Sequence, residues 1–204
     1  MAPSTPLFPP DLPEGFQYRE AFVHGAEEQH LVTEIGGLTF ANFEMRGVVA
    51  KRRVAFFGET YDRAAAAELP AFLLPLRALI GEWAQVDPEA FAMALINEYR
   101  PGAPIGWHRD APQYGIVAGV SLLTACRMKF RPYLSPSAGR GGADARRASH
   151  EITLAPRSAY LITGATRRDY EHHIPAVPAL RYSITFRTLR RPPSRLPGAG
   201  LRTT

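Results

Sequence analysis

Apolar side chains recur at helical spacing in two segments near the start of the chain. Gly25–Ile35 is the first, and a stronger pattern runs from about Pro70 to Ala84. Pro75 falls inside the second segment, so a kink or two shorter helices are expected there. The periodicity changes after Pro88, which places both predicted helices ahead of the remaining elements.

Short runs of strand-forming residues fill the second half of the chain, and turn-forming Gly and Pro residues separate them. The predicted strands are Phe91–Tyr99, Ile116–Leu123, Arg127–Pro132, Glu151–Leu154, Ala159–Thr163 and Arg181–Thr188. The stretch Ser135–Ser149 is rich in Gly, Ala, Ser and Arg and is expected to be a mobile loop between two strands. Many short strands behind two helices predict a mainly β, α+β fold, namely an antiparallel two-sheet roll supported by N-terminal helices. Patterning alone does not separate a jelly roll from another sandwich.

Composition indicates an ordinary globular domain. The 204 residues are 46% hydrophobic and 21% charged, close to the averages for such domains. No run approaches the roughly 18–20 apolar residues of a membrane span, and the first residues lack the pattern of a secretory signal. Cys126 is the only cysteine, so no intramolecular disulfide can form and a reducing compartment is expected. We therefore expect a cytoplasmic monomer with no membrane contact.

Positive charge is concentrated in three places along the chain. The net charge is +5 and the isoelectric point is near 9.7. The clusters are Lys51-Arg52-Arg53, then Arg140 with Arg146 and Arg147, then Arg190, Arg191, Arg195 and Arg202 in the tail. Such clusters suit phosphate backbones, but solvated faces of an arginine-rich protein give the same numbers.

Possible metal ligands lie in the strand-rich half. His108 and Asp110 are two residues apart, so in an extended segment both side chains point the same way. His172 follows about 60 residues later. Two histidines and one carboxylate make the facial triad that holds Fe(II) with open coordination positions. An isolated H-x-D triplet is also common by chance, and then it is a loop with a solvated ion pair.

Two predicted strands add polar groups that such a metal site would need. The strand from Arg181 places Ser183, Thr185 and Arg187 on the same face as Arg181. An arginine and a hydroxyl suit the far carboxylate of a chelating 2-oxo acid, although an edge strand with a polar face would look the same. The strand Phe91–Tyr99 ends an apolar face with Asn97 and Tyr99, polar groups that need partners if buried, unless Asn97 begins a turn.

These segments together resemble the AlkB family of nucleic-acid dealkylases. The resembling pattern is Asn97-x-Tyr99, His108-x-Asp110, Val120-Ser121-Leu122, Tyr170-Glu171-His172-His173-Ile174-Pro175 and Arg181-x-Ser183-x-Thr185-Phe186-Arg187. It covers residues 91–188 well, and residues 52–61 more weakly resemble the family's nucleotide-recognition region. The resemblance implies a double-stranded β-helix, or jelly-roll, core. Together with the proline-rich start and the arginines near the end, this predicts an extended segment 1–15, one oxygenase domain 16–190 and a basic tail 191–204.

The resemblance also implies roles for individual residues. His108, Asp110 and His172 would hold Fe(II), with His172 favoured over His173. Arg181, Tyr99 and Ser183 would bind the distal carboxylate of the cosubstrate 2-oxoglutarate, and Arg187 with Asn97 the end next to the iron. Tyr61 and, more weakly, Phe57 are candidates for stacking on a substrate base. Apart from the resemblance, Arg52 and Arg53 precede this aromatic segment and would hold the substrate's phosphates, and Trp107, next to a ligand, would line the pocket entrance. Phe57 and Tyr61 also suit plain core aromatics, and Trp107 an ordinary packing role.

The implied reaction consumes 2-oxoglutarate and dioxygen and hydroxylates a C–H bond of the substrate. If that carbon is an N-alkyl group of a DNA or RNA base, the product collapses to an aldehyde and the repaired base. One departure concerns the substrate, because Asp110 is followed by Ala111-Pro112-Gln113 with no acid where repair members often carry one. Two alternatives therefore stay open: an oxygenase acting on a protein or small molecule, and an inactive basic nucleic-acid-binding domain.

Overall fold

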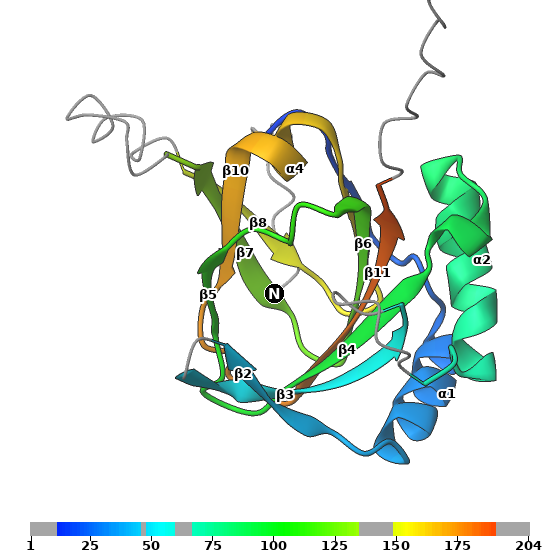
Figure 1. The fold of residues 1–204 in the computed structure, drawn as a ribbon. Coiled ribbons are helices and arrows are strands. Elements are labelled where there is room, and N and C mark those ends of the chain that lie inside the picture. Colours follow the sequence, from blue (N-terminus) through cyan, green and yellow to red (C-terminus); the bar gives the residue numbers. More distant parts are fainter. Residues whose placement is uncertain (1–11, 46–47, 60–66, 135–148, 191–204) are drawn as a thin grey trace, which may run out of the picture.

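The computed structural model describes residues 12–45, 48–59, 67–134 and 149–190. Within these ranges two antiparallel sheets face each other, with two helices on one side (Figure 1). The strands of the larger sheet are β1 Phe16–Arg19, β9 Ala159–Ile162, β6 Tyr114–Leu122, β11 Arg181–Leu189, β4 Met93–Tyr99, β3 Val48–Gly58 and β2 Ala41–Met45, in that spatial order. The smaller sheet has the order β5 Ile105–His108, β10 Tyr170–Ile174, β7 Cys126–Pro132 and β8 His150–Leu154.

The helices cover the outer face of the larger sheet. The two that do so are α1 Gly25–Gly36 and α2 Leu74–Ala84. One-turn 3-10 helices, η1 Ala71–Leu73 and η2 Pro88–Ala90, lie before and after α2 in the chain, and the short helix α4 Gly164–Asp169 leads into β10. Leu31 and Ile35 of α1 and Leu76 and Ile80 of α2 are buried in one cluster with β4, β6 and β11. This burial is what holds the two amphipathic helices to the sheet.

The structure confirms both predicted helices and resolves the question of Pro75. The second segment is two pieces, η1 and α2, and Pro75 occupies the first turn of α2. A proline is tolerated there because the first N–H groups of a helix have no intrahelical acceptor. The break therefore lies at Leu73–Leu74, and α2 carries no proline in its interior.

All six predicted strands are present, with ends shifted by one or two residues. The expected jelly-roll arrangement of two packed antiparallel sheets is confirmed. One predicted position needs correction, because alternation along a strand that begins at Phe91 places this ring on the same face as Asn97 and Tyr99. β4 begins at Met93, and Phe91 lies before it, packed on the helix side at 6.4 Å from the ring of Phe186. Residues 135–148 of the predicted loop, residues 1–11 and the tail 191–204 lie outside the described residues.

The two faces of β4 and β11 alternate as the sequence pattern predicts. Tyr182, Ile184 and Phe186 of β11 pack toward the helices. Ser183, Thr185 and Arg187 point into the space between the sheets, where they line a cavity. Apolar side chains from both sheets close one end of this space, and the other end stays open. Among the described residues no helix is long and apolar enough to cross a membrane.

Candidate active site

His108, Asp110 and His172 come together at the open end of the space between the sheets. β5 ends at His108, and Asp110 follows two residues later. β10 pairs antiparallel with β5 and places His172 opposite His108. The two imidazole centroids are 4.2 Å apart, and Nε2 of His172 lies 3.8 Å from Oδ2 of Asp110. Strand pairing thus joins two motifs separated by some 60 residues.

His173 points to the other face of β10. Its Nδ1 lies 2.7 Å from the carbonyl oxygen of Ile105, and its ring packs against Trp107 with centroids 5.1 Å apart. Adjacent residues of a strand face opposite sides of the sheet, so only one of the two histidines can meet His108 and Asp110. In this structure it is His172.

The protonation states of this cluster suit a divalent cation. Burial lowers the pKa of His108, and burial with the neighbouring His108 lowers the pKa of His172 to about 3. Burial alone would raise the pKa of Asp110, but Arg187 and both histidines outweigh it and hold the pKa well below its ordinary value. At neutral pH the cluster therefore offers two neutral imidazoles and one carboxylate, which is the protonation state metal binding requires.

The donor set fits Fe(II), although its side chains are not yet at bonding distance. Among the described residues no group of three or more His, Cys, Asp and Glu side chains is already spaced to hold an ion. Two ligands bound at about 2.0–2.2 Å to adjacent positions of one ion lie about 3 Å apart. The 3.8 Å between His172 and Asp110 must close by less than an ångström. Nδ1 of His108 lies 2.9 Å from the carbonyl oxygen of Gly106, a contact that leaves Nε2 as the ligating atom.

Arg187 fixes the carboxylate of Asp110. Its Nε and Nη2 lie 2.8 and 2.7 Å from Oδ1 of Asp110, and its Nη1 lies 3.5 Å from the sulfur of Met93. The resemblance assigns both Arg187 and Asn97 to the end of 2-oxoglutarate next to the iron, and that role stays a prediction. Asn97 accepts a hydrogen bond from Nε of Arg52 at 3.1 Å. Both residues line the same cavity, but their partners in this structure are Asp110 and Arg52.

Arg181 is a buried cation with no ion pair among the described residues. It is fully buried, and its Nε donates to Oγ of Ser121 at 3.1 Å. Its two terminal nitrogens have no hydrogen-bond partner among the described residues. The guanidinium lies 5.0 Å from the ring centroid of Tyr99, whose pKa is raised by burial. Leaving such a group unpaired is costly, so the site fits a carboxylate that would accept from both nitrogens. 2-Oxoglutarate has such a carboxylate at the end away from its metal-chelating oxo acid.

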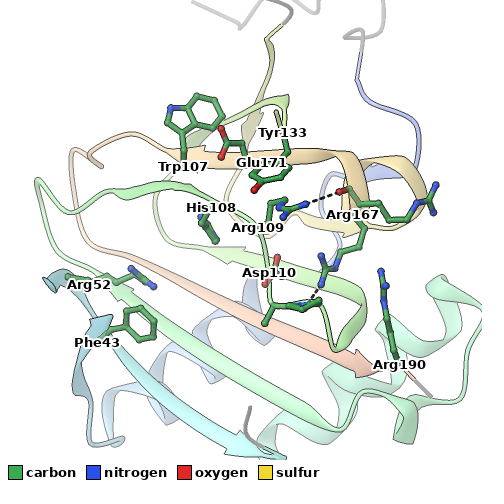
Figure 2. Close-up of a pocket in the computed structure, with 14 residues that line it drawn as sticks. Phe43, Arg52, Trp107, His108, Arg109, Asp110, Tyr133, Arg167, Glu171 and Arg190 are labelled. Atoms are coloured by element: carbon green, nitrogen blue, oxygen red, sulfur yellow. Dashed lines mark hydrogen bonds between the residues drawn. The ribbon is translucent and has the colours of Figure 1, made fainter. Parts of the chain in front are cut away.

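Two connected hollows surround these residues. The inner cavity has a volume of about 590 Å³ and lies between the sheets, lined by Tyr99, Tyr160, His172, Ser183 and Thr185 among others. The outer vestibule has about 880 Å³ and shares His108, Asp110, Arg52 and Phe43 with it. Figure 2 shows the vestibule, with Arg52 and Phe43 on one side of His108 and Asp110 and arginines on the other.

Only some of the predicted substrate residues lie in the vestibule. Arg52 and Trp107 line the vestibule. Arg53 faces the helix side, where it pairs with Glu98 at 2.8 Å, so the expectation that both arginines contact the substrate does not fit the structure. The physical reason is that they are adjacent on β3, a strand that the sequence did not predict. Phe57 packs in the helix-side core, whereas Phe56 faces the cavity. Tyr61 lies outside the described residues.

The vestibule also contains residues that sequence reasoning missed. They are Phe43, Arg109, Tyr133, Arg167, Arg168 and Arg190, four of them arginines. Arg167 is buried and donates to the carbonyl oxygens of Ala111, Tyr114 and Gly115, so it fastens the loop after Asp110 to α4. Only Arg190 belonged to a cluster visible in the sequence. His24, His30 and His150 line neither hollow.

Comparison with known proteins gives a family and a fold. A sequence profile of the 2OG-Fe(II) oxygenase superfamily matches residues 39–187. An Arabidopsis thaliana protein described as an alkylated DNA repair protein ALKBH8 homolog is 26% identical over 174 residues, which cover 76% of this chain and 49% of that protein. The chain thus spans about half the length of this relative.

Two solved structures have a similar fold. The structure of OsALKBH1 gives a TM-score of 0.62 at 12% identity and covers 87% of this chain and 99% of that one. A Pseudomonas putida prolyl-4-hydroxylase gives a TM-score of 0.56, also at 12% identity, and covers 87% and 94%. At this identity the likeness concerns the fold alone.

Proposed function

The chain belongs to the 2OG-Fe(II) oxygenase superfamily, and from that premise we propose that it oxidatively removes alkyl groups from bases of DNA or RNA. Enzymes of this class use Fe(II), 2-oxoglutarate and dioxygen. The proposed substrate is a base in a single strand, or one flipped out of a duplex, because a stacked base cannot reach an enclosed metal site.

One observation carries the substrate proposal: the hollow that opens onto His108 and Asp110 is wide, basic and partly aromatic. Its wall includes Arg109, Arg168 and Arg190 together with the rings of Phe43, Trp107 and Tyr133. Cations suit phosphates and aromatic rings suit bases, so this combination is typical of single-strand binding. The similarity to a protein described as an alkylated DNA repair protein homolog supports the same substrate class.

The chain's own side chains would prepare the site for this chemistry. His108, Asp110 and His172 would hold the iron, and Arg181 would hold the distal carboxylate of 2-oxoglutarate. Iron and 2-oxoglutarate, when bound, supply the oxidation of a C–H bond by dioxygen. Arg187 keeps Asp110 ionised and fixed in orientation. Met93, Leu95 and Phe43 line the cavity with apolar surface, which limits the water that reaches the reacting group.

The test is a turnover assay on single-stranded oligonucleotides that carry single N-methylated bases. With Fe(II), 2-oxoglutarate and oxygen, the wild-type protein should release formaldehyde and succinate in equal amounts. His172→Ala should lose both products, because a required ligand is gone. His173→Ala is the matched control, since it removes the same side chain from the opposite face of β10 and should retain turnover.

Succinate formation without formaldehyde from any oligonucleotide would contradict the nucleic-acid proposal while leaving the oxygenase class intact. A screen of peptides and small molecules for oxygen-dependent mass increases would then identify the substrate class. Equal loss of activity in both histidine variants would contradict the ligand assignment.

A further inference from the structure

Arg52 is a buried cation at the junction of the inner cavity and the vestibule. Its side chain is on β3, is 8% exposed and lines both hollows. Nε donates to Oδ1 of Asn97, and the guanidinium carbon lies 4.3 Å from the ring centroid of Phe43. Figure 2 shows it extending from β3 toward His108 and Asp110. The proposed metal position and Arg52 therefore share one space.

No carboxylate neutralises Arg52 within the part of the chain that the structure describes. The acids that line the vestibule with it are already paired, Asp110 with Arg187 and Glu171 with Arg131. Glu98, on the opposite face of the neighbouring strand, is paired with Arg53 and Arg100. Its hydrogen-bond partner Asn97 is neutral. Burial lowers the pKa of the Arg52 guanidinium, which reflects the cost of keeping an uncompensated charge there.

The surrounding charges have the same sign. Besides Arg52, the vestibule is lined by Arg109, Arg167, Arg168 and Arg190, against Asp110 and Glu171, which are both in ion pairs. A positively charged base entering this hollow would meet like charges in partly desolvated surroundings, where repulsion is stronger than in water. A neutral base with carbonyl oxygens would instead offer acceptors to a planar guanidinium.

We propose that Arg52 is a specificity-determining residue that favours neutral, carbonyl-bearing alkylated bases and disfavours alkylated bases that carry a positive charge. This inference rests on the proposed function, and it names the chemical class of base that the site accepts. It gives a physical role to a cation that otherwise destabilises the fold, since a buried charge without a counter-charge costs desolvation energy that no ion pair offsets. Repulsion of the wrong substrate is a recognised means of specificity.

The test compares two bases that differ mainly in charge. 3-Methylthymine is neutral and has a carbonyl on each side of the methylated nitrogen. 3-Methylcytosine carries its methyl group on the same ring nitrogen and is a cation at neutral pH. Each is placed in the same single-stranded oligonucleotide. The ratio of kcat/KM for the two should favour 3-methylthymine by about tenfold or more in the wild-type protein.

Arg52→Met should bring this ratio close to one, mainly by raising turnover of the cationic base, and Arg52→Lys should keep part of the preference. Lys51→Met is the matched control, because it removes one positive charge from an exposed neighbour on the same strand and should leave the ratio unchanged. Consumption of 2-oxoglutarate without oligonucleotide, together with thermal unfolding, verifies that each variant is folded and loaded.

Four results would overturn the inference. A wild-type preference for 3-methylcytosine, or the same ratio in folded Arg52→Met, would show that Arg52 does not select for charge. A raised KM for 2-oxoglutarate in Arg52→Met without oligonucleotide would assign Arg52 to the cosubstrate instead. If wild-type protein consumes 2-oxoglutarate but neither binds nor oxidises any oligonucleotide, the proposed function fails together with this inference. If it oxidises alkylated bases with a selectivity that does not depend on Arg52, only this inference fails.

Discussion

Arg181 and Arg187 point from the same face of β11 and are both buried, yet their surroundings are opposite. Arg187 has a protein carboxylate within 2.7 Å, so its charge is balanced before anything binds. Arg181 has only the hydroxyl of Ser121 on its Nε, and its two terminal nitrogens are unmatched among the described residues. One arginine therefore orients a protein group, and the other is set up to receive a ligand.

Replacing Arg181 with Lys should weaken 2-oxoglutarate binding by about 10- to 100-fold. The charge is kept, but the planar pair of donors is lost, and hydrogen bonds to charged groups contribute about 1.5–3 kcal/mol each. The measurement is the KM for 2-oxoglutarate together with direct titration of the Mn²⁺-loaded protein. Arg100→Lys, the same change at an exposed arginine, should leave both values unaltered. An unchanged affinity in Arg181→Lys would mean that the distal carboxylate binds elsewhere.

At the scale of elements, β6 and β9 approach each other where Tyr160 lies over Gly119. The two residues are register partners, and a Cβ placed on Gly119 would stand 2.2 Å from the ring of Tyr160. Tyr160 also lines the inner cavity close to Arg181, whose charge opposes the rise that burial causes in the pKa of this phenol. The absence of a side chain at Gly119 thus lets one aromatic residue form the cavity wall.

Gly119→Ala should therefore disturb both stability and the cosubstrate site. Forcing extra volume into a packed interior costs about 1–3 kcal/mol, and a displaced Tyr160 would alter the cavity wall near Arg181. Denaturant unfolding and 2-oxoglutarate titration measure the two effects. Gly106→Ala on β5 is the matched control, since a Cβ there meets nothing within 4 Å. Equal stability of the two variants would contradict this account of the β6–β9 contact.

Sequence patterns predicted the strands in which polar and apolar residues alternate and the helices in which apolar residues recur at helical spacing. The alternation in β4 and β11 predicted which residues face the cavity, and helical spacing predicted α1 and α2. β3 was missed because Lys51, Arg52 and Arg53 interrupt its apolar residues, and α4 because six residues are too few for a periodic pattern. The face on which a charged residue lies follows from strand pairing, so Arg52 and Arg53 could not be told apart beforehand.

The site was predictable to a similar extent. Candidate ligands two residues apart in an extended segment must share a face, which is local information. Contacts between distant segments are not local. Nothing in the sequence indicates that Arg167 would hold the carbonyls of Ala111, Tyr114 and Gly115, or that Phe43 would line the vestibule.

At the scale of the whole molecule, positive charge gathers around the vestibule. The net charge of +5 is modest, but among the described residues five arginines line this one hollow. Several of them are fixed by hydrogen bonds or ring contacts: Arg109 donates to the backbone of Arg168 and lies 3.4 Å from the ring centroid of Tyr133. A polyanion approaching the protein would be attracted toward the side on which the proposed metal site opens.

Arg168→Gln should weaken single-stranded oligonucleotide binding and flatten its salt dependence. Each phosphate contact to a single strand contributes about −0.7 to the slope of log K against log salt, so the slope should fall in magnitude by about that amount. Fluorescence anisotropy between low and moderate salt measures it. Arg127→Gln, at an exposed arginine that lines neither hollow, is the control for net charge. Identical slopes for the two variants would exclude Arg168 from the binding surface.

The alternation along β11 has a consequence for how this protein tolerates mutation. Even-numbered positions from Tyr182 to Phe186 pack under the helices, whereas Ser183, Thr185 and Arg187 face the cavity and Arg181 is buried on the same side of the strand. In a library of random variants, changes at the even positions should lower the amount of protein that accumulates in the cell. Changes at the odd positions should mainly give protein that accumulates but works poorly. Selection for folding and selection for activity would thus alternate residue by residue along a single strand. An insertion of one residue would turn each later side chain of the strand to the opposite face.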